Sequence, residues 1–123
     1  MAGQNLTGVA RIAAAFINSI KGFKATWTHE EAFRQEVYLL GVTAPLALWL
    51  GENGIEKALL LGAVLLVLIV ELLNTGIEIV VDRISFERHE LSGRAKDVGS
   101  AAVFLSLLLA GIVWIVILLP KFA

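Results

Sequence analysis

Three stretches of the chain are apolar and free of charge. Charged residues are absent from positions 37–51, 58–70 and 98–120. A helix of about 20 apolar residues spans the hydrocarbon core of a bilayer. The last stretch reaches that length alone, and the other two reach it when they are extended over a few polar residues. The pattern therefore predicts three transmembrane helices, at residues 33–50, 55–81 and 98–119.

The first 30 residues have an amphipathic helical pattern instead. At about 100° per residue, one side of a helix collects the large apolar side chains, which are Val9, Ile12, Phe16, Ile20, Phe23 and Trp27. The opposite side carries Arg11, Asn18, Lys21 and Lys24. These features predict a helix over residues 5–28 that lies along the membrane surface, with its cations among anionic lipid headgroups. The alternative is a helix that packs on a soluble partner protein.

Basic residues alternate between the two sides of the predicted membrane. Four Lys and Arg lie at or before the start of the first span, one in the first connection, four in the segment 82–97 and one in the C-terminal tail. Basic residues accumulate in cytoplasmic segments. The N-terminus and the 82–97 loop are therefore predicted to be cytoplasmic, and the C-terminus is predicted to lie outside. We expect residues 1–123 to form one integral-membrane domain.

The composition agrees with a membrane protein and excludes other classes. Apolar residues make up 58% of the 123 residues, against about 45–50% in soluble domains. The absence of Cys excludes a disulfide scaffold, and a net charge of -1 provides no basic field for nucleic acid. Ten Lys and Arg and eleven Asp and Glu are nevertheless present. Most of them lie near the predicted cytoplasmic boundary, which points to chemistry there.

The second predicted span carries polar residues on one face. Glu71, Asn74, Glu78 and Asp82 follow at i, i+3, i+7 and i+11, within about 80° around a helix. At 1.5 Å per residue, Glu71 lies about 10 Å inside the cytoplasmic boundary, where an ionised carboxylate costs about 2.5–3.5 kcal/mol. A carboxyl group in that place is suited to take a proton from a hydroxyl group. The alternative, polar contacts between the helices of a bundle, explains one Glu better than the complete stripe.

The segment 82–97 mixes acidic and basic residues around His89. A Mg-nucleotide needs both, because the metal takes oxygen ligands and the cations take phosphate oxygens. Taken alone, the segment is better explained as a solvated loop with cytoplasmic basic residues. Glu30, just before the first span, is expected at the same depth as Glu78 and this loop, so carboxylates from three places meet at one level.

The sequence of the polar stripe resembles that of a known family. The segment ELLNTGIEIVVD at 71–82 resembles the signature of the prokaryotic diacylglycerol kinases, and ELSGRAKD at 90–97 and AFRQE at 32–36 resemble other blocks of that family. The resemblance covers essentially the whole chain. It implies an all-α membrane protein, with an N-terminal surface helix and three transmembrane helices per chain, that forms a homotrimer in the bacterial inner membrane with a periplasmic C-terminus. It also implies transfer of the ATP γ-phosphoryl group to diacylglycerol, which gives phosphatidic acid.

The resemblance also implies roles for individual residues, in an active site shared between neighbouring subunits. Glu71 is expected to be the general base for the lipid hydroxyl, with Asn74 in support, and Glu30 and Glu78 are expected to hold Mg²⁺. The residues expected around the nucleotide are Arg11, Asn18, Glu30, Glu78, Asp82, Glu87, Arg88, His89, Lys96 and Asp97. The residues expected to contact the lipid are Arg11, Ser19, Lys24, Trp27, Ala32, Phe33, Arg34, Gln35, Glu36, Trp49, Lys57, Glu71 and Ser100.

The residues alone leave other functions open. The sequence has neither the P-loop pattern nor a soluble-kinase motif, so an ATP site has to be built differently. One alternative is a kinase that phosphorylates a polyprenol. Another, in a different class, is a small oligomeric transporter that conducts protons or cations along the stripe.

In the third span, a packing face between helices or subunits is indicated by small residues three or four apart, which are Gly99, Ala102, Ser106 and Ala110.

Overall fold

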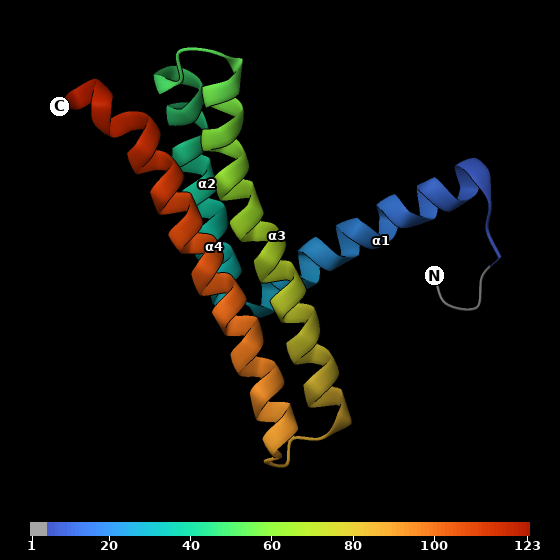
Figure 1. The fold of residues 1–123 in the computed structure, drawn as a ribbon. Coiled ribbons are helices and arrows are strands. Elements are labelled where there is room, and N and C mark those ends of the chain that lie inside the picture. The colour runs from blue at the N-terminus through green and yellow to red at the C-terminus, as the bar shows by residue number, and fades with distance from the viewer. Residues whose placement is uncertain (1–4) are drawn as a thin grey trace.

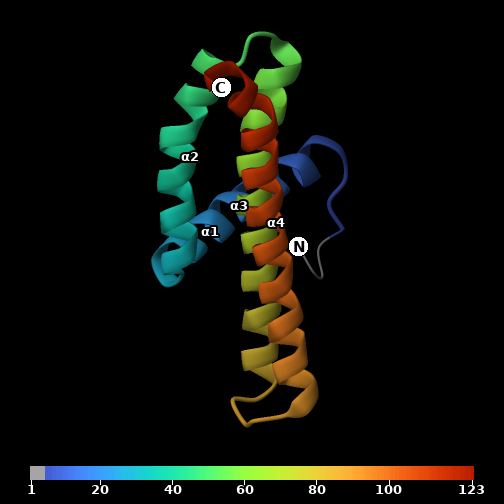
Figure 2. The ribbon, with the colours of Figure 1, turned by 60° about the vertical axis from the view of Figure 1, so that its left-hand side comes forward.

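Four helices make up nearly all of the computed structural model, which describes residues 5–123. They are α1 (Gly8–His29), α2 (Glu31–Leu50), α3 (Gly54–Ile84) and α4 (Glu90–Phe122). In both views α3 and α4 run side by side, α2 lies along the first half of α3, and α1 leaves the bundle sideways (Figure 1, Figure 2). The predicted all-α class is confirmed.

The helix α1 begins three residues later than the predicted start at residue 5. Its first residue, Gly8, has a φ of 61°, a left-handed conformation that glycine adopts readily. The apolar stripe of its first half does not pack on the rest of the chain, since Val9 is 83% and Phe16 is 67% exposed. That surface is available for a membrane or for another chain.

A sharp turn at Glu30 separates α1 from α2. The residue has an extended backbone, with φ −118° and ψ 108°. From α2, Arg34 Nη1 donates to the backbone oxygen of Trp27 at 2.6 Å and to that of Thr28 at 3.3 Å. The last carbonyl groups of a helix have no partner within it, so these bonds stabilise the end of α1. They also fix α2 against α1.

A tight connection joins α2 to α3. Gly51 is buried there, and a Cβ atom on it would lie 2.6 Å from Lys57 Cγ and 3.0 Å from the backbone oxygen of Ala47. Asn53 begins α3 as its N-cap, because its Oδ1 accepts a hydrogen bond from Glu56 N at 2.9 Å. The glycine thus permits a close return of the chain, and the asparagine starts the next helix.

The connection between α3 and α4 is shorter than the predicted 82–97 loop. Only residues 85–89 lie outside the two helices. α4 starts directly after His89, whose Nδ1 accepts a hydrogen bond from Leu91 N at 3.1 Å. Charged residues mark where a helix leaves an apolar layer, but they do not end the helix, because Glu, Lys and Arg are good helix formers. The polar segment is therefore mostly helical.

Two of the described helices, α3 and α4, are long and apolar enough to cross a membrane. α2 has only 20 residues, and its first two turns contain Glu31, Arg34 and Glu36. These charges lower its mean hydropathy. The structure thus supports two of the three predicted spans, and a membrane crossing by α2 stays a prediction.

Contacts at one end of the bundle tie α4 to the rest of the chain. Trp114 Nε1 of α4 donates to the backbone oxygen of the buried residue Leu60 at 3.0 Å. Lys121 Nζ lies 2.8 Å from Glu52 Oε1 and 3.0 Å from Glu56 Oε1. This end holds the α2–α3 connection and the C-terminus, and the α3–α4 connection lies at the opposite end (Figure 1).

The indole hydrogen bond should contribute measurably to stability. Trp114→Phe keeps much of the ring but removes the donor to the Leu60 carbonyl. Side-chain hydrogen bonds between membrane helices contribute about 0.6 kcal/mol on average, so we expect the free energy of unfolding to fall by at least about that amount in a denaturant titration in micelles. Trp49→Phe is the matched control, because Trp49 is 78% exposed. Equal stabilities of the two variants would contradict this role of the bond.

Candidate active site

The polar stripe of α3 faces the interior of the bundle. Glu71 and Asn74 are buried, with exposures of 4% and 7%, and Glu78 and Asp82 are half-buried. The helical spacing that puts these residues on one face also puts them against the neighbouring helices. Burial of polar groups is costly unless they find partners. This face of α3 is therefore the first candidate for a functional site.

Carboxylates from α2, α3 and the α1–α2 junction gather around Glu71. Glu36 of α2 is 8% exposed, and its Oε2 has no hydrogen-bond partner among residues 5–123. Glu30, Glu36 and Glu78 all lie within electrostatic reach of Glu71. None of the ion pairs in the described part of the chain includes these four residues. Because like charges repel, such a group favours the approach of a cation.

A Mg²⁺ ion fits the donors that this group offers. Mg²⁺ is usually held by one or two carboxylates together with substrate phosphates and water. Within residues 5–123, no three Asp, Glu or His side chains lie close enough to hold a metal by themselves. One or two carboxylates are enough for a metal that also binds the phosphates of a nucleotide. Glu30 and Glu78 are the two carboxylates for which the family resemblance implies this task.

Asn74 connects the stripe to α4. Its Nδ2 donates to Glu78 Oε1 at 3.1 Å. Its Oδ1 is directed toward Gly99 of α4 and is buried without a hydrogen bond from the residues that the structure describes. The amide therefore orients the Glu78 carboxylate, in the way that neighbouring groups commonly orient carboxylates that bind metals.

The polar end of the bundle contains a small hollow lined by both acids and bases. Lys96 Nζ of α4 donates to Asp82 Oδ1 of α3 at 2.7 Å, and this bond raises the pKa of the Lys96 ammonium group. The pair borders a hollow of about 240 Å³ beside the α3–α4 connection, together with Glu87, Arg88 and His89. Five of the residues predicted around a nucleotide thus surround one space, and Asp97 lines an adjoining hollow with Arg88 and His89.

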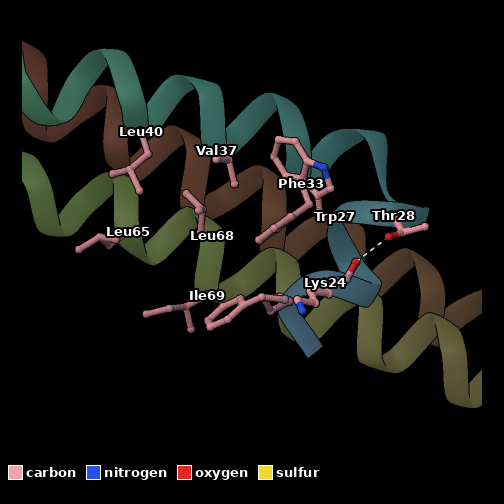
Figure 3. Close-up of a pocket in the computed structure, with 11 residues that line it drawn as sticks. Lys24, Trp27, Thr28, Phe33, Val37, Leu40, Leu65, Leu68 and Ile69 are labelled. Carbon is pink, nitrogen blue, oxygen red and sulfur yellow. Dashed lines mark hydrogen bonds between the residues drawn. The ribbon is translucent and has the colours of Figure 1, made fainter. Parts of the chain in front are cut away.

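An apolar pocket of about 710 Å³ lies among α1, α2 and α3. Figure 3 shows its side chains converging from the three helices. They include Phe23 and Trp27 of α1, Phe33, Val37 and Leu40 of α2, and Leu65, Leu68, Ile69 and Leu72 of α3. Lys24 and Thr28 add polar groups from α1. A mostly apolar lining with a few polar groups is typical of ligand-binding pockets.

Comparison with known proteins identifies the family. A sequence model described as prokaryotic diacylglycerol kinase matches residues 17–118. The chain belongs to the prokaryotic diacylglycerol kinase family. The diacylglycerol kinase of Escherichia coli (strain K12) is 49% identical over 118 residues, which cover 96% of this chain and 97% of that protein. Those of Haemophilus influenzae and Pseudomonas aeruginosa are each 50% identical, and the matches cover 88% and 92% of this chain and 92% of each relative.

Membership of the diacylglycerol kinase family confirms the predicted kind of protein. The chain is an ATP-dependent lipid kinase, and its apolar helices α3 and α4 agree with a membrane protein. The family match gives no support to the alternative of an ion transporter. The identified family also agrees with the two kinds of space in the structure, one apolar and one polar, on either side of the Glu71 region of α3.

A single chain does not bring together all the residues that the family resemblance implicates. Arg11 and Asn18 are exposed on the part of α1 that leaves the bundle (Figure 1). Trp49 and Lys57 lie at the α2–α3 end, far along the bundle from the polar hollow. Further predicted lipid contacts are exposed on α1, α2 and α4, namely Ser19, Ala32, Gln35 and Ser100. Their roles stay predictions.

The kinase also has two buried residues, Thr75 and Gly99, for which the sequence analysis predicts no role in the active site. Thr75 is 4% exposed, and its Oγ1 lacks a hydrogen-bond partner among the residues described. Its position at i+4 from Glu71 places it beside the stripe, so helical spacing is a signal that identifies it. Gly99 is predicted only as a packing residue, and its contact with Asn74 is visible only in the folded chain.

Proposed function

We propose that this kinase transfers the γ-phosphoryl group of ATP to the free hydroxyl of diacylglycerol and forms phosphatidic acid and ADP. The observation that carries the proposal is the position of the buried Glu71. Leu68 and Leu72, which precede and follow it on α3, line the apolar pocket, and Glu78 and Asp82 lead from it to the polar hollow. A lipid hydroxyl and a water-soluble nucleotide can meet only at a junction of this kind.

In the proposed mechanism, the Glu71 carboxylate takes the proton of the lipid hydroxyl. The hydroxyl oxygen then forms a bond to the γ-phosphorus as the bond to the ADP oxygen breaks. Glu30 and Glu78 would hold Mg²⁺, which supplies charge neutralisation at the phosphates. Asn74 keeps Glu78 in place. Phosphoryl transfer depends mainly on such positioning and neutralisation, so the chain needs no covalent nucleophile.

The polar hollow is the proposed place for the nucleotide. Lys96 and Arg88 offer cations to the phosphate oxygens, while Asp82 holds Lys96 through its 2.7 Å hydrogen bond. Glu87, His89 and Asp97 border the same region. Arg11 and Asn18 would reach the nucleotide from the α1 helix of a neighbouring chain.

The apolar pocket is the proposed place for an acyl chain of the lipid. Trp27 and Phe33, both predicted lipid contacts, form part of its wall. Its volume of about 710 Å³ lies within the usual range of ligand pockets. Arg34 and Glu36 lie next to Phe33 on α2, at the side where the lipid headgroup has to meet Glu71.

We also propose that α2 crosses the membrane and that three chains assemble. The cytoplasmic side would then hold the N-terminus and the 82–97 segment, and the periplasmic side the C-terminus. Support comes from exposed apolar surface on α4, including Phe104 at 68% and Val116 at 65%. Residues such as Arg11 and Asn18, which are exposed on the part of α1 that leaves the bundle, suit a site completed by neighbouring subunits.

The proposal is tested by following the phosphoryl group. The purified protein is mixed with diacylglycerol in detergent micelles, with ATP labelled at the γ-phosphate and with Mg²⁺. We expect labelled phosphatidic acid, and we expect none when the lipid or Mg²⁺ is left out. A folded protein that gives no labelled lipid would overturn the proposal, and release of labelled phosphate alone would indicate an ATPase.

Filling the apolar pocket should weaken binding of the lipid selectively. Leu68→Trp places a larger ring among the lining residues, so we expect KM for diacylglycerol to rise about tenfold, which corresponds to about 1.4 kcal/mol, while KM for ATP stays constant. Ile115→Trp is the matched control, because Ile115 is 60% exposed on α4 and lies outside the pocket. Equal lipid KM values for the two variants would argue against an acyl chain in this pocket.

A further inference from the structure

We infer that Gly99 of α4 is a positioning residue for phosphoryl transfer, because it leaves the space in which Asn74 holds the Glu78 carboxylate. The inference rests on the proposed roles of Asn74 and Glu78. It adds a residue on a different helix, which touches neither nucleotide nor lipid in the proposal and acts only through the Asn74 side chain.

The contact between the two residues is very close. A Cβ atom added at Gly99 would overlap with Asn74 Oδ1 and would lie 3.1 Å from Asn74 Cγ. The three nearest atoms that it would meet all belong to Asn74. Gly93 and Gly111, also in α4, would meet nothing within 4 Å. Space for Asn74 therefore distinguishes Gly99 from the other glycines of its helix.

Backbone conformation does not explain this glycine. Among the described residues, the only positive φ angle belongs to Gly8, so Gly99 adopts a helical conformation that any residue can take. Glycine is less favourable than alanine inside a helix. Its presence at a buried position of α4 therefore needs a steric reason, which the Asn74 amide supplies.

Asn74 cannot move aside without a consequence for the site. Its side chain is 7% exposed, and its Nδ2 donates to Glu78 Oε1 at 3.1 Å. The Oδ1 atom points at Gly99 because Nδ2 is engaged by the carboxylate. A methyl group at position 99 would push the amide away from α4, break the bond to Glu78 and leave that carboxylate free to rotate. Loss of such an orienting partner commonly weakens metal binding by about 10–100-fold.

The test measures metal binding rather than turnover alone. Mn²⁺ replaces Mg²⁺, and its binding is titrated by electron paramagnetic resonance in the presence of a non-hydrolysable ATP analogue. We expect Gly99→Ala to weaken Mn²⁺ binding about tenfold and to raise the Mg²⁺ concentration for half-maximal activity by a similar factor, while KM for diacylglycerol stays constant. Gly111→Ala, the matched control in the same helix, should bind Mn²⁺ like the wild type. Unchanged Mn²⁺ binding in folded Gly99→Ala would overturn the inference.

A double-mutant cycle separates a positioning effect from a general disturbance. Asn74→Ala should weaken Mn²⁺ binding, and adding Gly99→Ala to it should cause no further loss, because the atoms that the new methyl group would strike are gone. An equal loss in both backgrounds would overturn the inference. If Gly99→Ala alone does not fold, the double variant decides, since it should fold and bind Mn²⁺ like Asn74→Ala. If Asn74→Ala itself binds Mn²⁺ normally, the proposed role of Asn74 fails and the inference fails with it.

Discussion

Glu71→Gln should abolish nearly all phosphoryl transfer while the four helices stay folded. Glutamine has almost the same size and shape as glutamate, but its amide cannot take a proton from the lipid hydroxyl. General-base catalysis contributes about 10²–10⁴-fold to a rate, so we expect kcat to fall by about that factor. The measurement is the formation of labelled phosphatidic acid at saturating diacylglycerol, ATP and Mg²⁺. KM for ATP should change little, because the proposed base contacts the lipid.

Two controls accompany this variant: its free energy of unfolding, and the activity of a variant that lacks a different carboxylate. Removal of a charge from a buried group of acids relieves repulsion, so the free energy of unfolding should be equal to that of the wild type or higher. Glu52→Gln removes a carboxylate at the opposite end of the bundle, where Glu52 is paired with Lys121, and should keep full activity. Substantial turnover by a well-folded Glu71→Gln protein would remove Glu71 from the role of base.

Lys96→Met should lower kcat/KM for ATP by about 10²–10³-fold, the usual cost of removing one group aimed at the charge that develops in a transition state. Methionine keeps much of the length of lysine but has no charge. Loss of the ammonium also leaves Asp82 without its 2.7 Å partner, and the freed carboxylate repels the phosphates. The measurement is an ATP titration at fixed, saturating diacylglycerol.

The same substitution at the other end of α4 is the matched control. Lys121 also pairs with carboxylates, Glu52 and Glu56, at 2.8 and 3.0 Å. Lys121→Met should therefore reduce stability but keep kcat/KM for ATP. Lys96→Arg, which preserves the charge, should restore part of the activity. Similar catalytic losses in Lys96→Met and Lys121→Met would show that Lys96 acts only in folding.

Local sequence patterns predict which parts of this chain form apolar or amphipathic helices, but they predict less well where each helix begins and ends. The three runs without charge lie largely within α2, α3 and α4, and the amphipathic pattern of the first 30 residues covers α1. The predicted loop 82–97 is wrong as a loop, because hydropathy reports the solvent around a residue and not where backbone hydrogen bonding stops. Residues 82–84 and 90–97 are mostly polar and are still helical. A membrane crossing by α2 stays a prediction, because the first turns of α2 contain both charged and apolar residues.

Some features of the candidate site follow from the spacing of residues along one helix, and others depend on how the helices pack against each other. Helical spacing alone puts Glu71, Asn74 and Glu78 on one face, and the structure buries that face. The approach of Glu36 to Glu71 depends on how α2 lies against α3, and the contact of Gly99 with Asn74 depends on how α4 lies against α3. The sequence pattern of a single helix does not predict how that helix packs against its neighbours. The fold of one chain leaves Arg11 exposed near the start of α1, so its predicted role depends on the proposed assembly of chains.

The measurement that tests the central claim most directly is a competition between two lipids. Diacylglycerol and a polyprenol are supplied together, at equal concentration in the same micelles, with ATP labelled at the γ-phosphate and Mg²⁺. If the site built around Glu71 accepts diacylglycerol, nearly all of the label should appear in phosphatidic acid. Label found mainly in polyprenyl phosphate would contradict the claim.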